Sequence, residues 1–169
     1  RNKPLASDVN FKSLARLTVG FTGADIENVL NESAILAARD NRKLITMKDI
    51  SEAVNKVEAG PAKKSRLVTE TDKRITAYHE SGHAIIAKKL GNNTVHEVTI
   101  IPRGQAGGFT ISLPANDDAY MTKQKLLDRI TELLGGRAAE EIVIHDISTG
   151  ASNDIQRASQ IARKMVTEW

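Results

Sequence analysis

Two histidines four residues apart, with a glutamate directly after the first, form the part of this sequence with the clearest chemistry: His79-Glu80-Ser81-Gly82-His83. On a helix, the second histidine lies about 40° around the axis from the first and one turn further along, so both imidazoles point to the same side. Two nitrogen ligands on one rigid face suit a hydrolytic zinc ion. Glu80 lies about 60° from His83, where a carboxylate reaches a water molecule beside the metal without binding the metal itself. The pattern predicts a zinc site with Glu80 as general base.

Gly82 stands inside this predicted helix. Glycine in a helix interior costs about 1 kcal/mol relative to alanine and usually has a packing or access reason. We expect Gly82 to clear space beside the metal. The alternative interpretation is an amphipathic helix whose histidines are ordinary half-buried or solvated residues.

A catalytic zinc site takes three protein ligands and keeps one position open, so a third ligand has to come from further along the chain. The metzincin extension requires a glycine and a histidine at positions where this chain has Ile86 and Lys89. His96 and His145 are chemically suitable, but no motif orients them. Histidine is therefore not favoured as the third ligand.

Carboxylates are the remaining candidates. Glu140 and Glu141 would suit a site of two histidines and one glutamate. Asp154 lies in the segment from Ser148 to Asp154, at the first turn of a predicted helix, where a carboxylate is also favourable simply because of the helix dipole. On the residues alone, Asp154 and the pair Glu140/Glu141 are nearly equal candidates.

The elements that position these groups can be predicted from capping and periodicity. The helix that carries the histidines is expected from about Glu70 to Leu90, followed by Gly91. A β-hairpin follows, with alternating strands around residues 97–100 and 109–113 and a glycine-rich turn at residues 103–108. An exposed edge of this hairpin is a candidate for pairing with an extended polypeptide.

Helices resume over residues 122–134 and 136–144. The last helix is expected to begin near Ala151 and to present one apolar face, formed by Ile155, Ala158, Ala162, Met165 and Trp169.

The first sixty residues read as a small helical bundle. Asn10 is a predicted cap for a short helix ending at Leu17, and Thr22 with Asp25 predicts a long helix. A second capping pair, Thr46 with Asp49, precedes a third helix. This segment has no predicted strand and no cluster of catalytic residue types.

Composition narrows the classes further. The chain has 169 residues, a net charge of +3, no cysteine and six aromatic residues (Trp 1, Tyr 2, Phe 3). Without cysteine, any metal must be held by nitrogen and oxygen. Nucleic-acid binding is not expected, because the basic residues are spread along the chain and lack aromatic stacking platforms. No apolar run approaches the roughly 20 residues that cross a bilayer, so we expect no membrane segment here.

Gly20-Phe21-Thr22-Gly23-Ala24-Asp25-Ile26, followed by Asn31-Glu32-Ser33-Ala34, resembles the helical lid subdomain of AAA+ ATPases. The resemblance implies that Gly23 and Ala24 lie near the adenine of a bound nucleotide. The chain has no Gly-x-x-x-x-Gly-Lys-Ser/Thr phosphate loop, so ATP or ADP is expected only in a longer parent protein.

Four later blocks resemble, in order, the peptidase domain of the FtsH-type membrane-anchored AAA+ zinc proteases. They are residues 77–84, 98–104, 135–141 and 148–154. The resemblance implies that the zinc ligands are His79, His83 and Asp154. It also implies that Glu140 and Glu141 lie on the helix surface or hold a ligand histidine through its other ring nitrogen.

Together these features predict a mainly α fold: a small helical AAA+ lid bundle (residues 1–59), a linker (60–69) and a mostly helical zinc peptidase domain with a small β-hairpin (70–169), expected to be truncated at its C-terminus. The basic stretch at residues 63–66 is read as part of the linker.

The resemblance implies an ATP-dependent zinc endopeptidase that cleaves unfolded and membrane proteins. Its parent is expected to be a homo-hexamer anchored in the inner membrane, with this part on the cytoplasmic side. The competing interpretation is a noncatalytic lid and assembly module with an idle peptidase site.

Overall fold

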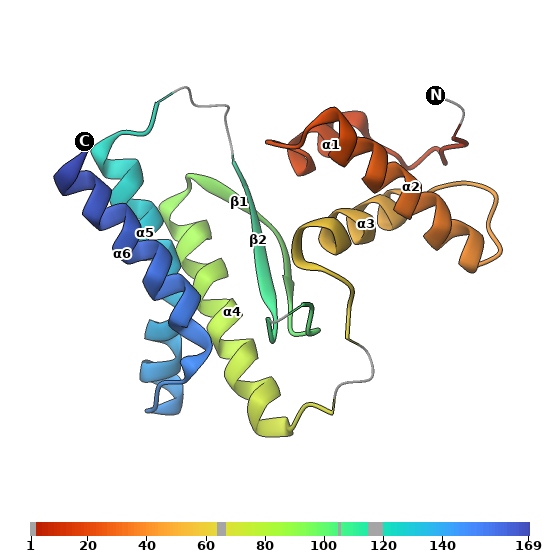
Figure 1. The fold of residues 1–169 in the computed structure, drawn as a ribbon. Helices are drawn as coiled ribbons and strands as arrows, with labels where there is room; N and C mark the ends of the chain where they lie inside the picture. Colours follow the sequence, from red (N-terminus) through yellow and green to blue (C-terminus); the bar gives the residue numbers. More distant parts are fainter. Residues whose placement is uncertain (1–2, 64–66, 105, 115–119) are drawn as a thin grey trace. The chain divides into compact units, whose positions relative to one another are not determined.

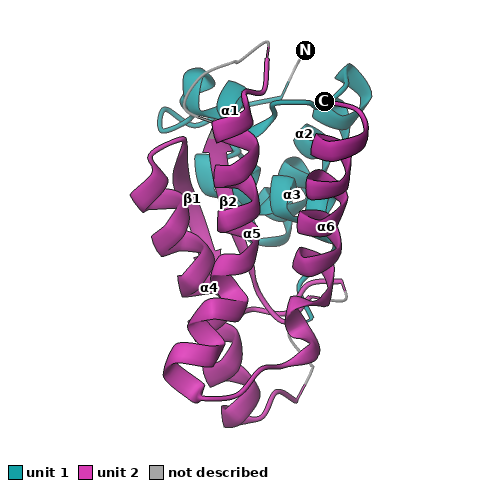
Figure 2. Ribbon diagram, turned by 90° about the vertical axis from the view of Figure 1, so that its left-hand side faces the viewer, with its two compact units in different colours: residues 1–63 teal, residues 64–169 magenta. Residues whose placement is uncertain are grey.

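The computed structural model describes residues 3–63, 67–104, 106–114 and 120–169. Its contacts divide the chain into two compact units, Arg1–Lys63 and Lys64–Trp169, coloured separately in Figure 2. This division falls inside the linker expected at residues 60–69. Three residues of the basic stretch at 63–66, namely 64–66, lie outside the described residues. No helix in the described part of the chain combines the length and the apolar character that a bilayer crossing requires.

The first unit is a bundle of three helices, α1 (Phe11–Leu17), α2 (Gly23–Arg39) and α3 (Met47–Ala59). Their starts are fixed by side-chain caps from Asn10, Thr22 and Thr46, and the last two form complete capping boxes. The capping residues named from the sequence are therefore confirmed.

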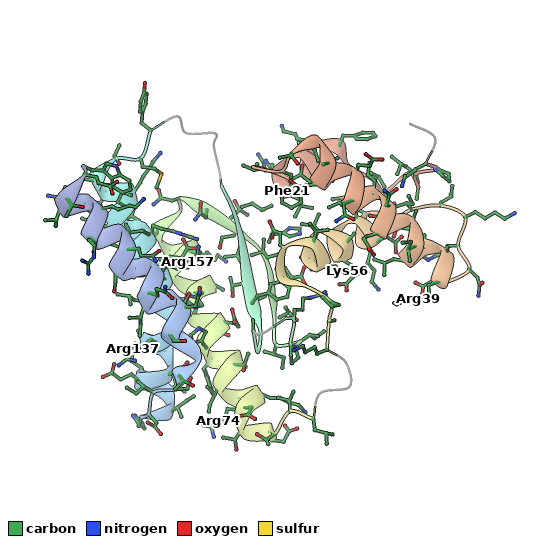
Figure 3. All side chains as sticks on the ribbon, in the orientation of Figure 1. Phe21, Arg39, Lys56, Arg74, Arg137 and Arg157 are labelled. Atoms are coloured by element: carbon green, nitrogen blue, oxygen red, sulfur yellow. The ribbon has the colours of Figure 1, made fainter. Side chains whose placement is uncertain are left out.

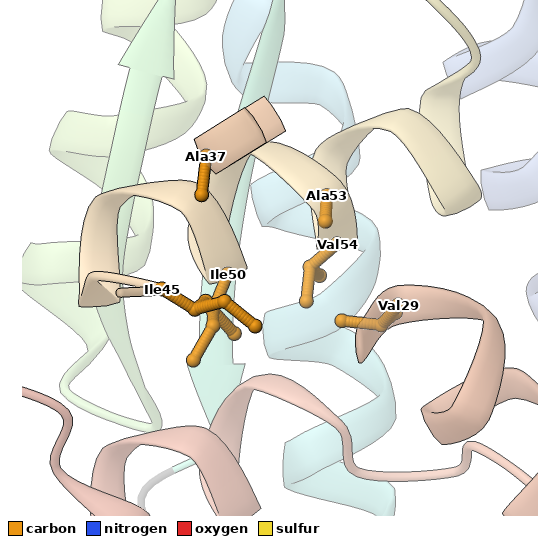
Figure 4. Close-up of a cluster of buried hydrophobic side chains, with 6 residues drawn as sticks. All are labelled: Val29, Ala37, Ile45, Ile50, Ala53 and Val54. Carbon is orange, nitrogen blue, oxygen red and sulfur yellow. The ribbon is translucent and has the colours of Figure 1, made fainter. Parts of the chain in front are cut away.

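Six buried apolar side chains form the core of this bundle (Figure 4). They come from α2, from the segment before α3 and from α3 itself: Val29, Ala37, Ile45, Ile50, Ala53 and Val54. Partly buried side chains such as Phe21 pack around them.

Two ion pairs add to this packing. Lys56 of α3, labelled in Figure 3, lies 2.5 Å from Glu32 of α2, and Arg42 contacts Asp49 at 2.6 Å.

The second unit is built around α4 (Glu70–Leu90), which packs against α5 (Lys123–Ile144) and also contacts the strands β1 (Asn93–Thr99) and β2 (Phe109–Pro114). A short 3-10 helix, η1 (Thr149–Ala151), leads into α6 (Ser152–Thr167), which packs on α5. Figure 1 shows α4 between the hairpin and the two later helices. The predicted bounds of the histidine helix are confirmed, with Gly91 as its left-handed cap.

The hairpin is antiparallel, with Thr110 opposite Val98 and a register shift between Val95 and Glu97. Its first strand starts at Asn93, two residues after the Gly91 cap of α4 and several residues earlier than the sequence pattern predicts. The predicted turn at 103–108 contains residue 105, which lies outside the described residues.

Two helices were expected at residues 122–134 and 136–144, and this expectation is wrong. One continuous helix, α5, runs through Gly135 and Gly136. A Cβ at Gly135 would lie 2.9 Å from the carbonyl oxygen of Gly82 on α4. The two helices therefore approach each other at glycines, and this packing outweighs the modest cost of glycine inside a helix.

The face of the last helix that packs inward also differs from the apolar face expected from the sequence. Ala158 is buried and Met165 partly buried as expected, but Ile155, Ala162 and Trp169 are exposed, and Trp169 retains 67% of its accessible surface. The face that packs inward includes Asp154, Ala158 and Ile161. The sequence pattern followed apolar residues only, whereas the packed face includes the carboxylate of Asp154.

Candidate metal centre

The two histidines of α4 meet at their outer ring nitrogens. His79 Nε2 lies 3.0 Å from His83 Nε2, and the two rings stand edge to face with centroids 4.7 Å apart. This pairing follows from the four-residue spacing on one helix. His79 is buried and His83 is half-buried.

Asp154 brings a carboxylate to the same point from the first turn of α6. Its Oδ2 lies 3.3 Å from His79 Nε2 and 3.4 Å from His83 Nε2. The chain reaches this position through a tight segment in which Ser148 caps η1 by accepting from the Gly150 amide. The ligand atoms that the three side chains offer all lie within 4.8 Å of one another.

The inner ring nitrogens fix which tautomer each histidine adopts. His83 Nδ1 lies 2.8 Å from the backbone carbonyl oxygen of Glu132, which can only accept, so this nitrogen carries the proton. His79 Nδ1 lies 2.6 Å from Glu140 Oε1 and donates to that carboxylate. In the neutral rings, both Nε2 atoms therefore present lone pairs.

This donor set fits a zinc ion. Two nitrogen lone pairs and one carboxylate oxygen point into the same small volume, an arrangement that is repulsive without a proton or a cation between them. Ligands about 2.0–2.1 Å from a tetrahedral zinc lie roughly 3.3 Å from one another. The three observed separations, 3.0, 3.3 and 3.4 Å, are close to that spacing.

The electrostatics of the cluster also favour positive charge. Burial disfavours the charged imidazoles, but hydrogen bonds to Asp154 and Glu140 outweigh burial at His79 and raise its pKa. The pKa of His83 is raised in the same way, by Asp154 and the Glu132 carbonyl, against the effect of burial. Burial would raise the pKa of Asp154, yet the two histidines hold it well below its usual range.

Glu80 lies beside this cluster on α4 and is buried, with 6% of its surface exposed. Burial raises the pKa of its carboxyl group, against the opposing effect of the hydrogen bond from Thr110 and the nearby histidines. A carboxylate with a raised pKa is a better proton acceptor than an exposed glutamate.

Glu140 connects the two parts of the cluster. Its Oε1 accepts from the His79 ring, and its Oε2 accepts from the backbone amide of Ser148 at 2.7 Å. One buried carboxylate on α5 therefore holds a histidine of α4 and also the start of the segment that leads to Asp154. The family resemblance implies that Glu140 and Glu141 lie on the helix surface or hold a ligand histidine. Glu140 contacts the histidine, and Glu141 is exposed on α5.

The space beside the imidazoles comes from Gly136, which sequence reasoning did not identify as part of the site. A Cβ there would lie 2.6 Å from His79 Nε2 and 2.6 Å from His83 Nε2. The expectation that Gly82 clears this space is wrong, because a Cβ at Gly82 would meet Gly135 O at 2.3 Å. Gly82 serves the contact between α4 and α5. The adjacent glycines are the available signal in the sequence, but by themselves they predict a helix break.

The other candidates lie elsewhere. Among the described residues, the group of close ligand atoms does not include Glu141, His96 or His145. His96 is exposed on β1, and His145 is the exposed left-handed cap of α5. Gly23 and Ala24 belong to the first unit, where they form the first turn of α2 after the Thr22 cap.

A helix with a His-Glu-x-x-His pattern, completed by a carboxylate from a distant helix, defines the class of single-metal hydrolase sites. Comparison with known proteins agrees with this class: residues 66–169 match peptidase family M41, and residues 8–52 match the AAA+ lid domain. The chain belongs to peptidase family M41.

Several relatives match this chain over its whole length or nearly all of it. The chain is 61% identical to "ATP-dependent zinc metalloprotease FtsH 1" of Thermoanaerobacter sp. (strain X514), with 100% of this chain and 28% of the relative covered. It is 56% identical to "ATP-dependent zinc metalloprotease FtsH" of Bacillus subtilis (strain 168), with 100% of this chain and 27% of that relative covered. The chain is 54% identical to the protein of the same name from Thermotoga maritima, with 99% of this chain and 28% of that relative covered. These matches confirm the FtsH-type resemblance, and the chain spans little more than a quarter of each of these relatives.

Proposed function

We propose that this chain holds the peptidase site of an ATP-dependent zinc metalloprotease and that this site hydrolyses peptide bonds. The observation that supports the proposal is the meeting of His79 Nε2, His83 Nε2 and Asp154 Oδ2 at mutual distances of 3.0 to 3.4 Å. The inner partners of the two histidines leave both Nε2 atoms as lone-pair donors, and the Asp154 carboxylate supplies the third donor atom. In the proposal these three atoms bind zinc.

Bound zinc supplies Lewis acidity, which activates water and polarises the carbonyl group of a peptide bond. The chain's own contribution to proton transfer is Glu80. Its buried carboxylate takes a proton from the attacking water and later delivers that proton to the nitrogen of the leaving amine. Glu140 and the Glu132 carbonyl keep both rings in the tautomer that directs Nε2 to the metal.

The experiment measures zinc content and hydrolysis of unfolded casein by the 169-residue chain and by Glu80→Gln. We expect about one zinc per chain in both proteins, and a rate in the variant that is lower by roughly two to four orders of magnitude. Full activity in Glu80→Gln would remove Glu80 as the base. A chain that binds zinc but cleaves nothing, alone or after addition of the remaining parts of its parent, would instead favour the noncatalytic assembly role.

For the longer parent protein we propose the properties that membership of this family suggests. These are a homo-hexamer anchored in the inner membrane, with this part on the cytoplasmic side, that uses ATP to unfold polypeptide and membrane-protein substrates. Gly23 and Ala24 would lie near the adenine, a proposal supported by their position at the start of α2, where helix amide groups point outward. This placement is tested by measuring the ADP affinity of the longer parent protein with and without Gly23→Val.

A further inference from the structure

The hydroxyl group of Thr110, on β2, makes two contacts with one residue. Its Oγ1 lies 2.8 Å from Glu80 Oε2 and 3.0 Å from the Glu80 backbone carbonyl oxygen. The hairpin therefore reaches both ends of the residue to which we assign proton transfer. Neither the His-Glu-x-x-His pattern nor the ligand set includes Thr110.

The start of β2 is built closely around the same glutamate. A Cβ at Gly108 would lie 3.1 Å from Glu80 Cγ and 2.5 Å from the Thr99 carbonyl oxygen. Gly108 is buried and thus leaves room for the methylene stem of Glu80, while Thr110 two residues later meets its carboxylate. The pairing of Thr110 with Val98 fixes the position of Thr110 along the hairpin.

A hydroxyl suits this position because it can donate to a carboxylate oxygen. The Thr110 hydroxyl donates to Glu80 Oε2, and the Glu80 backbone carbonyl oxygen, 3.0 Å from the same Oγ1, is a second acceptor nearby. Both acceptors belong to Glu80, so Thr110 holds the carboxylate in a fixed position relative to the backbone of α4.

We propose that Thr110 is a positioning residue for Glu80, and that the two contacts of its hydroxyl group hold the Glu80 carboxylate in place. This inference rests on the proposed function, because it assigns Thr110 a part in the proton transfer by Glu80. Thr110 itself exchanges no proton with the substrate and binds no metal.

The first test uses the zinc-loaded chain and a fluorogenic peptide. Thr110→Val keeps the shape of the side chain but removes the hydroxyl, and we expect kcat to fall about 10- to 100-fold with KM and zinc content unchanged. Thr110→Ser restores the hydroxyl and should recover most of kcat. In the Glu80→Gln background, Thr110→Val should lower the residual rate no further, because its effect acts through the carboxylate.

The second test needs no catalysis. Urea unfolding of the metal-free chain is followed for Thr110→Val, for Glu80→Met, which removes the carboxyl group at similar length, and for the double variant. We expect Thr110→Val to lower the unfolding midpoint when it is the only substitution. In the Glu80→Met background it should lower the midpoint much less. Thr18→Val removes a hydroxyl that lies 3.0 Å from the Leu14 carbonyl oxygen in the other unit, and should have the same effect in both backgrounds.

The outcomes separate this inference from the proposed function. If the zinc-loaded chain without substitutions cleaves no peptide, the proposed function fails for this chain. The positioning role then fails as well, even if the effect of Thr110→Val on the unfolding midpoint depends on Glu80. If the parent cleaves peptides and Thr110→Val keeps its kcat, the positioning role alone is overturned. Equal midpoint shifts of Thr110→Val in both backgrounds would overturn it as well. A lower kcat, recovered by Thr110→Ser and accompanied by coupled midpoints, supports it.

Discussion

Gly136 on α5 lies directly against the imidazole of His79 on α4: a methyl group at Gly136 would be 2.6 Å from both Cε1 and Nε2 of that ring. The same methyl group would be 2.6 Å from His83 Nε2. Both nitrogens assigned to the metal therefore depend on the absence of one side chain on the neighbouring helix.

Gly136→Ala should weaken zinc binding by at least about tenfold, because both rings must turn away from their positions. Alanine is the better helix former by about 1 kcal/mol, so a weaker helix would not explain the loss. Competition with a fluorescent zinc chelator measures the affinity. Gly23→Ala is the control, since a Cβ at Gly23 meets no atom within 4 Å. Unchanged affinity in Gly136→Ala would contradict the tight fit of α5 on the histidines.

Gly82→Ala should destabilise the second unit and not primarily the metal site. Its Cβ would meet Gly135 O at 2.3 Å and the Ala139 Cβ at 2.7 Å, so α4 and α5 would have to separate. Such overpacking typically costs about 1–3 kcal/mol. Urea unfolding followed by Trp169 or Tyr78 fluorescence gives the free energy of unfolding. A variant as stable as the parent would show that the two helices can separate at little cost.

Asp154→Asn should lower zinc affinity more than any other single carboxylate change in this chain, because a neutral amide replaces an anionic ligand. Equilibrium dialysis against zinc measures the loss. The result that reverses this assignment is an unchanged affinity in Asp154→Asn together with a large loss in a glutamate variant.

Glu140→Gln should weaken zinc binding by about 10- to 100-fold. In glutamine an NH2 group replaces one of the two carboxylate oxygens and would face either the His79 ring N–H or the Ser148 amide N–H, so one of these two hydrogen bonds is lost. Glu141→Gln is the matched control one residue later, on the exposed side of α5, and should bind zinc like the parent. Equal affinities in all three proteins would mean that the contacts of Glu140 do not affect the metal.

The first unit should lose stability at acid pH through Asp49. The Arg42 guanidinium, with help from Thr46, holds the pKa of this carboxyl group well below its usual range, although burial opposes that shift. A pKa lowered by folding stabilises the fold fully above the unfolded value, about 3.9. The stabilisation declines as pH falls below that value and is lost as pH falls through the lower pKa of the folded state. Urea titrations read at the Ile50 methyl signal should therefore give lower stability at pH 3 than at pH 6.

Asp49→Asn isolates this contribution. At pH 6 it should cost about 1–2 kcal/mol, and this cost should become smaller as the pH falls toward 3. Asp40 is the control because it contacts the same Arg42 at 3.0 Å from an exposed position, with 61% of its side chain accessible. Asp40→Asn should change stability by less than about 1 kcal/mol. A pH dependence that survives in Asp49→Asn would assign the acid sensitivity to another group.

Local features were determined by the sequence itself. The capping pairs Thr22/Asp25 and Thr46/Asp49 start the helices that they predict, because a cap involves atoms only three residues apart. The spacing of His79 and His83 places both nitrogens on one side of α4 for the same reason, since 3.6 residues per turn leaves no other arrangement.

Contacts between distant segments were decided by the tertiary structure. Asp154 lies 75 residues after His79 and could not be separated from Glu140 and Glu141 by residue type, because all three are carboxylates near helices. The packing of α5 on α4 brings Glu140 within hydrogen-bond distance of the inner ring nitrogen of His79. The same packing places Gly135 and Gly136 in contact with α4, whereas the sequence predicts a helix break there. Thr110 reaches Glu80 only because the hairpin folds back onto α4. Periodicity and capping describe one element at a time, whereas these contacts depend on how close two elements can come.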